Sequence, residues 1–261
     1  MNKVFTMGID VGSTASKCVI LQDGKDIISK SLIPVGAGTS GPSRAIKEVL
    51  DNCGLSKEDM AFSLATGYGR NSIDWVDCQM SELTCHAKGA YFLFPNVRTV
   101  IDIGGQDAKV LGIDERGFLK NFVMNDKCAA GTGRFLDVMA RVLEVDINDL
   151  ERYSEMSTKT VNISSTCTVF AESEVISQLA QNTDRCDIIR GIHRSVAGRV
   201  AGLAKRIGIQ DALVMTGGVA QNKGVVKALE EELGREIFTS PLAQYSRALG
   251  AALIAYEKRE K

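Results

Sequence analysis

The sequence is poor in tryptophan, histidine and proline, and neither sign of charge is in excess. It contains 1 Trp, 2 His and 4 Pro, and its 31 Lys and Arg residues face 32 Asp and Glu residues. Nucleic acids and anionic membrane surfaces require clustered cations, so this balance argues against either partner. No apolar run is long enough to span a bilayer, and the first residues lack the apolar core of a signal peptide. We therefore expect a cytoplasmic protein that binds neither nucleic acid nor a membrane.

Cysteine is present without the spacing of a disulfide framework or a zinc knuckle. The chain has 7 Cys, an odd number, and no C-x-x-C pair. Both histidines, His86 and His193, lie on expected helices without a histidine or acidic residue four positions later, so we interpret them as structural. Packing is also the simpler interpretation for most of the cysteines, although the pair at 78 and 85 is close enough for a second metal site. These packing cysteines are Cys18, Cys53, Cys78, Cys85 and Cys186.

Two stretches of the chain resemble each other, "FTMGIDVGSTASKCVILQDGKDIISKSLIP" and "RTVIDIGGQDAKVLGIDERGFLKNFVMN". Each begins with an apolar strand that ends at an aspartate, Asp10 or Asp102. Each continues through a small-residue turn into a strand that carries Lys17 or Lys109, and then through a glycine turn into a third strand. Alignment of the two aspartates also aligns the two lysines, which favours a true duplication.

Alternating helices and strands are expected after each three-stranded segment. Apolar periodicity predicts helices over 43–53, 81–94, 133–145, 169–181, 187–208, 221–234 and 243–260, and strands over 61–67, 212–218 and 236–239. The sequence therefore predicts an α/β fold of two duplicated domains, each a mixed sheet with flanking helices. We expect the first domain to comprise residues 1–95 plus 240–261 and the second residues 96–239, with a ligand-binding cleft between them and a hinge near Pro95.

Three glycine-rich turns have chemistry that suits a nucleotide. The first, "DVGSTASK", lacks the Walker A spacing, but it offers a close backbone approach together with hydroxyl and amide donors. The second, "DIGGQDAK", would form a matching cradle, and the third, "MTGGVAQN", would let an adenosine lie against the backbone. The candidate nucleotide-binding residues are Gly12, Ser13, Thr14, Ala15 and Lys17 in the first, Gly104, Gly105 and Gln106 in the second, and Gly217, Gly218, Gln221 and Asn222 in the third.

Any one of these turns alone is compatible with an ordinary hairpin. Together, in this order and on this repeat, they resemble the two phosphate motifs and the adenosine motif of the acetate and sugar kinase, Hsp70 and actin superfamily. The resemblance covers nearly the whole chain, and it implies ribonuclease-H-like (actin-like ATPase) domains that bind ATP or ADP with Mg²⁺. For hydrolysis we expect Asp10 and Asp102 to position Mg²⁺ through water, Lys17 to offset phosphate charge and Gln106 to orient the attacking water.

We expect two cysteines, Cys128 and Cys167, to stand at the N-termini of helices. Amides at a helix N-terminus stabilise anions, so a thiolate or an iron–sulfur cluster gains from this location. A cubane cluster takes four thiolates, which the two cysteines of each subunit of a two-fold dimer would supply; the alternative is a pair of inert thiols. The candidate caps of the second helix are Ser164, Ser165, Thr166 and Thr168.

The runs "NDKCAAGTGRFLDVMA" and "STCTVFAESEVIS" resemble the activator component of (R)-2-hydroxyacyl-CoA dehydratases, within the BadF/BadG/BcrA/BcrD ATPase family. Activators of 2-hydroxyglutaryl-CoA dehydratase are the members they resemble most. The resemblance implies a homodimer with one 4Fe–4S cluster, held by Cys128 and Cys167 of each subunit. It also implies ATP-driven donation of one electron to a dehydratase component, with reduced ferredoxin or flavodoxin as the source. The acyl group of the partner's substrate stays open.

Two other functions are compatible with the ATP motifs. A small-molecule kinase of the sugar or acetate type would share them, but we identify no acidic residue poised over a substrate hydroxyl, and such a kinase leaves the two cysteines unexplained. A non-enzymatic ATP switch of the Hsp70 kind would also share them, although no peptide-binding domain is evident in the sequence.

Overall fold

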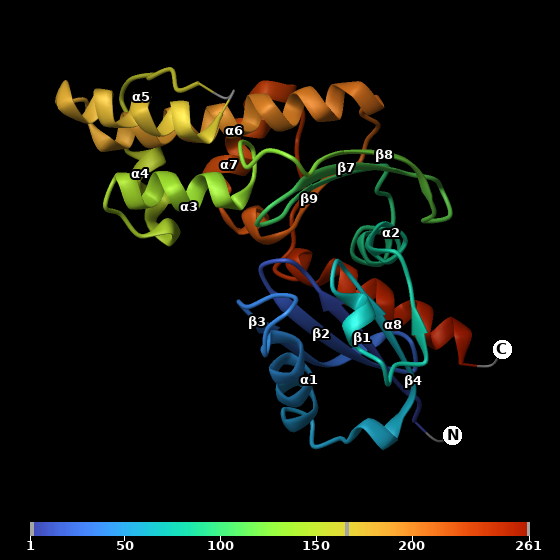
Figure 1. The fold of residues 1–261 in the computed structure, drawn as a ribbon. Helices are drawn as coiled ribbons and strands as arrows, with labels where there is room; N and C mark the ends of the chain where they lie inside the picture. The colour runs from blue at the N-terminus through green and yellow to red at the C-terminus, as the bar shows by residue number, and fades with distance from the viewer. Residues whose placement is uncertain (1–2, 165–166, 260–261) are drawn as a thin grey trace. The chain divides into compact units, whose positions relative to one another are not determined.

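The computed structural model describes residues 3–164 and 167–259, and it divides into two compact units (Figure 1). Unit 1 comprises Met1–Val97, Ile113–Leu119 and Leu242–Lys261, and unit 2 comprises Arg98–Gly112 and Lys120–Pro241. Each unit holds a mixed β-sheet with helices, so the predicted α/β class is confirmed.

The elements follow the expected order closely. The strands are β1 (Phe5–Val11), β2 (Ser16–Gln22), β3 (Asp26–Ile33), β4 (Met60–Thr66), β5 (Cys78–Gln79), β6 (Thr99–Ile103), β7 (Ala108–Ile113), β8 (Leu119–Asn125) and β9 (Leu213–Thr216). The α-helices are α1 (Gly41–Asp51), α2 (Glu82–Leu93), α3 (Gly133–Val142), α4 (Leu150–Glu155), α5 (Thr168–Ala180), α6 (Arg185–Ile207), α7 (Lys223–Leu233) and α8 (Ser246–Lys258).

Unit 1 is a sheet in the order β3-β2-β1-β4-β5 with helices on both faces. Strand β2 shows why both faces are covered, because its side chains alternate. Cys18 and Ile20 pack in the cluster that includes α1, whereas Val19 and Leu21 pack in the cluster that includes α8. A strand that is apolar at successive positions therefore lies in the middle layer of three.

Helices α2 and α8 pack against each other at two glycines. A Cβ atom on Gly89 would lie 1.8 Å from the carbonyl oxygen of Ser246, and one on Gly250 would lie 1.7 Å from that of Cys85. These distances are far below van der Waals contact, so this close helix packing requires glycine at both positions. The packing fixes α8, which carries a residue of the candidate site.

Unit 2 is a sheet in the order β8-β7-β6-β9, accompanied by helices α3 to α7. Helix α3 packs against α5, and α6 packs against α4 and α7. In Figure 1, α3 and α5 run in the same direction, so their N-termini lie at the same end of the helical layer. Of the apolar side chains of α3, those of Phe135, Leu136 and Met139 are buried, whereas that of Val138 is only half-buried.

The two units repeat one pattern of strand pairing. Asp10 pairs with Lys17 in the antiparallel register of β1 and β2, and Asp102 pairs with Lys109 in that of β6 and β7. The first strand of each unit is also paired in parallel with a later strand, β4 or β9. The alignment of the two aspartates and lysines in the sequence thus corresponds to equivalent positions in the two sheets.

The structure differs from the sequence expectations in several places, one of which is the two-residue strand β5, which the sequence does not predict. The strand expected over 236–239 is a single bridge, in which Phe238 pairs with Val214. Helix α4 was not expected, because its six residues are too short to show a helical period.

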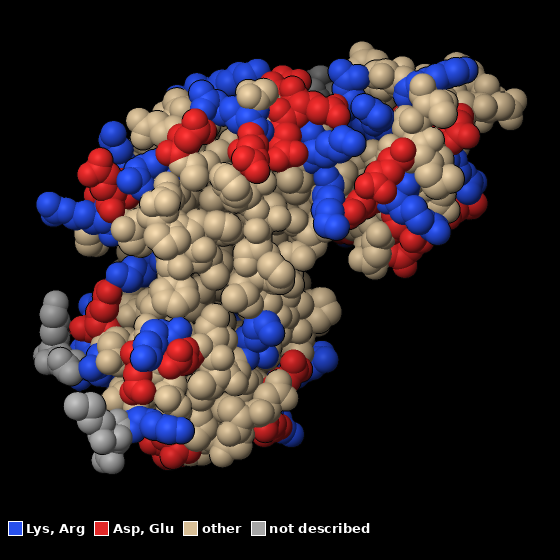
Figure 2. Space-filling model, turned by 180° about the vertical axis from the view of Figure 1, so that it is seen from behind, with Lys and Arg blue, Asp and Glu red and all other residues tan. Residues whose placement is uncertain are grey.

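Figure 2 shows Lys and Arg interspersed with Asp and Glu over the face in view, without a field of one sign. Among the helices of the described ranges, none is both long enough and apolar enough to cross a bilayer.

Candidate functional site

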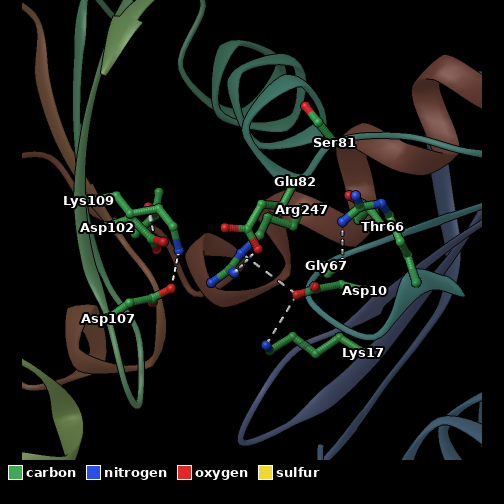
Figure 3. A network of polar contacts seen from close by, with 12 residues as sticks. Asp10, Lys17, Thr66, Gly67, Ser81, Glu82, Asp102, Asp107, Lys109 and Arg247 are labelled. Atoms are coloured by element: carbon green, nitrogen blue, oxygen red, sulfur yellow. Dashed lines mark hydrogen bonds and ion pairs between the residues drawn. The ribbon is translucent and has the colours of Figure 1, made fainter. Parts of the chain in front are cut away.

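The carboxylate of Asp10 lies at the end of β1, fully buried and flanked by two cations. Lys17 Nζ lies 3.4 Å from Asp10 Oδ2, and Arg247 Nε, on α8, lies 3.8 Å from the same oxygen. Figure 3 shows both side chains directed toward Asp10. The other oxygen, Oδ1, is buried and accepts no hydrogen bond from the described residues. A buried carboxylate oxygen without a donor is a vacant acceptor, which suits a hydrated cation or water.

A glycine after β4 makes room for this carboxylate. Gly67 has a φ of +90°, and a Cβ there would lie 2.5 Å from Asp10 Oδ1 and 2.6 Å from the carbonyl oxygen of Val11. Any other residue would therefore be strained in its backbone and would collide with the carboxylate. This glycine was not predicted, although "ATG" at 65–67 parallels "MTG" at 215–217 in the sequence.

Arg247 links Asp10 to a second carboxylate. Its NH1 atom lies 3.6 Å from Glu82 Oε2, at the first residue of α2. Arg247 and Glu82 expose only 13% and 23% of their side chains, so solvent screens this pair less than a surface pair. The sequence prediction missed both residues.

The turn between β1 and β2 contains the first group of predicted nucleotide-binding residues. Gly12 N donates to Ala15 O at 3.1 Å, which closes the turn, and Ala37 N donates to Gly12 O at 2.9 Å. Ser13 and Thr14 are exposed at its tip, where their hydroxyls and amides are open to a ligand.

Unit 2 also has a buried aspartate, Asp102, with a lysine and a glycine nearby. The Asp102 carboxylate is buried at the end of β6 and accepts a hydrogen bond from Thr216 Oγ1 at 3.2 Å. Lys109, also buried, forms an ion pair with Asp107 (Figure 3). Gly217 has a φ of +84°, and a Cβ there would lie 2.7 Å from Asp102 Oδ1, as the Cβ of Gly67 would from Asp10.

The second predicted loop joins β6 to β7. Gly104 N donates to Asp107 O at 2.9 Å, which repeats the closure of the first turn. Gln106 is exposed at the tip of this loop, and Gly105 is half-buried.

The third predicted motif forms a buried strand that ends in a glycine turn. Gly217 and Gly218 follow β9, and Gln221 ends the short 3₁₀ helix η4 (Gly218–Gln221) with its side chain exposed. Asn222 caps α7, because its Oδ1 accepts a hydrogen bond from Val225 N at 3.1 Å. Its Nδ2 lies 3.4 Å from Nε2 of the buried His193. The side chain of Asn222 is thus already engaged within unit 2.

The prediction that Cys128 heads a helix is wrong. Helix α3 begins at Gly133 with Thr132 as its N-cap, so Cys128 precedes the helix by more than one turn. The cause is local, because Gly131 has a φ of +85° and Thr132 is extended, with φ −125° and ψ 172°. The half-buried Cys128 therefore lies in a loop, and the macrodipole of α3 acts on it only weakly.

Cys167 does occupy a helix N-terminus. It is the N-cap residue of α5, half-buried, with φ −148° and ψ 138°, and its own side chain makes no capping hydrogen bond. Ser164 and Thr168 are therefore not the cap, while Ser165 and Thr166 lie outside the described residues. Ser164 N instead donates to Glu174 Oε2 at 2.6 Å, which ties the preceding loop to α5.

Two of the other cysteines and both histidines are buried. Cys18 is buried in β2, and burial raises its pKa far above the usual range for a thiol. Burial also raises the pKa of Cys85 to about 12, so its thiol is protonated at neutral pH. His86 and His193 are both buried. Within residues 3–164 and 167–259, no three His, Cys, Asp or Glu side chains are grouped so as to hold a metal ion.

The start of α3 contacts the second predicted loop directly. Gly133 N donates to Gly104 O at 2.9 Å, and Arg134 N donates to Gly105 O at 2.8 Å. Amides at the start of a helix lack partners within the helix, so these two carbonyls satisfy them. The loop that ends β6 and the segment that carries Cys128 are therefore joined by main-chain hydrogen bonds.

Known proteins resemble this chain over its whole length. The chain is 69% identical over 259 residues to the (R)-2-hydroxyglutaryl-CoA dehydratase activating ATPase of Acidaminococcus fermentans, with 99% of each chain covered. The solved activator of the 2-hydroxyisocaproyl-CoA dehydratase from Clostridium difficile, with bound ADPNP, is 54% identical and superimposes with a TM-score of 0.96 over 98% of this chain and 96% of that one.

A more distant structure shows the fold alone. A glucokinase of the ROK family from Streptomyces griseus is 16% identical, covers 97% of this chain and 99% of its own, and has a TM-score of 0.60. It agrees with the predicted superfamily fold. The family model described as the BadF/BadG/BcrA/BcrD ATPase family matches residues 7–255. Since that match spans nearly all of the chain, the protein belongs to the BadF/BadG/BcrA/BcrD ATPase family.

Proposed function

We propose that this chain is the activating ATPase of a 2-hydroxyacyl-CoA dehydratase, with 2-hydroxyglutaryl-CoA dehydratase as the partner it fits best. The identity of 69% over nearly the full length to such an activator is the observation that carries the proposal. In this function the chain hydrolyses ATP and delivers one electron at a time to the dehydratase, on which the dehydration takes place. A reduced ferredoxin or flavodoxin supplies the electron.

The two aspartate sites support the ATPase part of this function. Asp10 and Asp102 would hold the hydrated Mg²⁺ of MgATP, and the vacant Oδ1 of Asp10 fits that role. Lys17 lies within reach of the same carboxylate, and the exposed amides and hydroxyls of Ser13 and Thr14 would bind phosphate oxygens. Gly12, Ala15, Gly104 and Gly105 shape the two loops, and Gln106 would orient the attacking water from its exposed position. Gly217, Gly218, Gln221 and Asn222 would surround the adenosine.

The settings of Cys128 and Cys167 fit the ligands of an iron–sulfur cluster. Both thiols are half-buried and free, as are those of Cys53, Cys78 and Cys186, and the family motifs single out Cys128 and Cys167 among the five. Cys167 occupies the N-cap position of α5, where free amides favour a thiolate or an anionic cluster. With these two thiols in each chain, two copies in a homodimer would hold one 4Fe–4S cluster. When bound, the cluster supplies one-electron transfer at low potential.

Air-free purification of the wild type and of Cys128→Ala and Cys167→Ala tests this function. We expect the wild type to be a dimer with about four irons, and each variant to lose nearly all iron. Cys53→Ala is the matched control, since its thiol donates to the Val49 carbonyl at 3.3 Å in unit 1 and should leave the iron content unchanged. Reduced protein should then transfer electrons to the dehydratase only with MgATP. An iron-free monomer that phosphorylates sugars would contradict the proposal and favour a small-molecule kinase instead.

A further inference from the structure

The side chain of Asn125 makes two hydrogen bonds to the loop that carries Cys128. Asn125, the last residue of β8, donates from Nδ2 to the carbonyl oxygen of Cys128 at 2.8 Å and to that of Ala130 at 3.2 Å. A side-chain amide nitrogen has two N–H groups, and both are used on this loop. The bond to Cys128 O fixes the peptide unit next to the Cα atom that bears the thiol.

A second side chain tightens the same loop. Thr132 is fully buried, and its Oγ1 donates to the carbonyl oxygen of Ala129 at 2.7 Å, while its backbone N donates to that oxygen at 3.0 Å. Three successive carbonyls thus each accept a side-chain hydrogen bond. Asn125 bonds those of residues 128 and 130, and Thr132 bonds that of residue 129.

The far end of this segment is attached to the loop after β6. Gly133 N and Arg134 N donate to the carbonyls of Gly104 and Gly105. Every step from Cys128 to the predicted phosphate loop is therefore a hydrogen bond or a covalent bond within one short segment. A change in the loop at 104–105 has to move α3 or break these bonds, because a helix end without partners is costly.

We propose that Asn125 is the positioning residue for Cys128: it holds the loop in place, so that a movement of the nucleotide loop at Gly104–Gly105, passed along residues 128–134, reaches this thiol. The role of Cys128 as a cluster ligand rests on the function proposed above, whereas the hold of Asn125 on the loop does not. An aspartate at this position would have the same shape, but its ionised carboxylate has no donor and would face two carbonyl oxygens. Asn125→Asp therefore releases the loop while it changes the side-chain volume very little.

Cys167 provides an internal comparison. Its loop is tied by a different contact, from Ser164 N to Glu174 Oε2 at 2.6 Å, which involves no atom of Asn125. An effect that passes through Asn125 should reach Cys128 and spare Cys167, whereas general loosening of unit 2 should reach both.

The test uses the full-length protein purified without air, with and without ADPNP. One readout is the rate of iron release to a ferrous chelator, and the other is the alkylation rate of each cysteine by iodoacetamide, resolved by peptide mass spectrometry. For Asn125→Asp we expect iron release and Cys128 alkylation to rise about fivefold, equivalent to about 1 kcal/mol, or one net hydrogen bond. Cys167 alkylation measured on iron-depleted protein should stay within about twofold. The dependence of the Cys128 rate on ADPNP should disappear.

The controls separate the inference from a folding defect and from the proposed function. Asn121→Asp puts the same charge on an exposed position of the same strand, and it should match the wild type. Asn125→Ala removes both side-chain hydrogen bonds without adding a charge, so it should act in the same direction as Asn125→Asp, and it replaces that variant if Asn125→Asp does not fold. Wild-type rates at Cys128 in folded Asn125→Asp, or in folded Asn125→Ala, overturn the inference. A wild type without iron overturns the proposed function instead, and the alkylation readout still tests Asn125.

Discussion

Arg247 and Asp10 meet from opposite ends of the chain, with Arg247 Nε 3.8 Å from Asp10 Oδ2. The same guanidinium reaches Glu82 on α2, so one arginine links the aspartate that ends β1 to two helices of unit 1. This arrangement implies that the charge at Asp10 is balanced by α8 as well as by the turn that contains the predicted phosphate-binding residues.

Loss of Arg247 should therefore weaken ATP hydrolysis. In Arg247→Gln, Asp10 keeps Lys17 but loses its second cation, and Glu82 loses a partner. We expect kcat for ATP to fall about tenfold, equivalent to about 1.4 kcal/mol, because the Asp10 carboxylate loses one of its two cationic neighbours. A phosphate-release assay measures this, with Arg235→Gln as the control, since that residue pairs with Asp211 on the surface. Equal loss in both variants would point to a general effect of charge.

Asp102→Asn should separate binding from hydrolysis. The substitution keeps the shape of a side chain that accepts a hydrogen bond from Thr216 but removes its charge. We expect ATP turnover to fall about 100-fold, while ADPNP affinity changes only a few-fold, because the carboxylate acts chiefly on the metal in the transition state. Calorimetric titration measures the ADPNP affinity, and single-turnover assays measure the rate of ATP hydrolysis. Asp126→Asn, at an exposed ion pair, is the control, and turnover within threefold of wild type contradicts the assigned role.

Glycine substitutions should have opposite signs at two kinds of site. Gly217→Ala places a Cβ 2.3 Å from the carbonyl oxygen of Ile103 at a positive φ, so we expect a loss of stability of about 2 kcal/mol or more. Gly198→Ala and Gly202→Ala lie inside α6 with nothing within 4 Å, and each should stabilise the protein by up to about 1 kcal/mol. Urea unfolding monitored by far-ultraviolet circular dichroism measures all three, and a neutral Gly217→Ala would refute the assigned strain.

We expect the free energy of unfolding to decrease in mild acid, because His193 is buried in its neutral form. Burial lowers the pKa of His193 from 6.5 to about 4. Between these values the unfolded chain binds a proton that the folded chain does not, so the free energy of unfolding decreases as pH falls from about 6.5 toward 4. At pH 5 the loss relative to pH 8 should be about 2 kcal/mol.

Urea titrations of the wild type and of His193→Gln at both pH values measure this effect. Glutamine does not titrate and retains a polar group for Asn222, so the variant should show a smaller difference between the two pH values. An equal pH dependence in the two proteins would assign the acid sensitivity to other groups.

The paired strands and turns were predictable because their signals are local. The apolar run before Asp10, the glycine after it and the lysine on the return strand all fall within one hairpin, and the repeat at Asp102 made them easier to detect. Glu82 and Arg247 gave no such signal. Each lies at the start of a helix, and only the packing of α8 on the sheet and of α2 on α8 brings them to Asp10.

The two cysteines show the limit of sequence patterns at helix ends. The apolar period of α3 predicts the helix from Gly133 onward, but it contains no information on whether the preceding residues are helical. Gly131 in a left-handed conformation and Thr132 in an extended one keep Cys128 outside the helix, whereas Cys167 directly precedes α5. The contacts of Asn125 could not be predicted, because an asparagine at a strand end is equally suited to a turn.

The C-terminal position of α8 has a consequence for biosynthesis. A Cβ on Gly8 of β1 would lie 2.0 Å from the carbonyl oxygen of Ala248, so the first strand and the last helix are in direct backbone contact. All of unit 2 is translated between them. While the ribosome is still extending the chain, one apolar face of the N-terminal sheet is uncovered. Val19 and Leu21 on this face become buried only when Leu249 of α8 packs against them. Unit 2 can complete its own core earlier, and a nascent chain that stalls before α8 should be a substrate for chaperones.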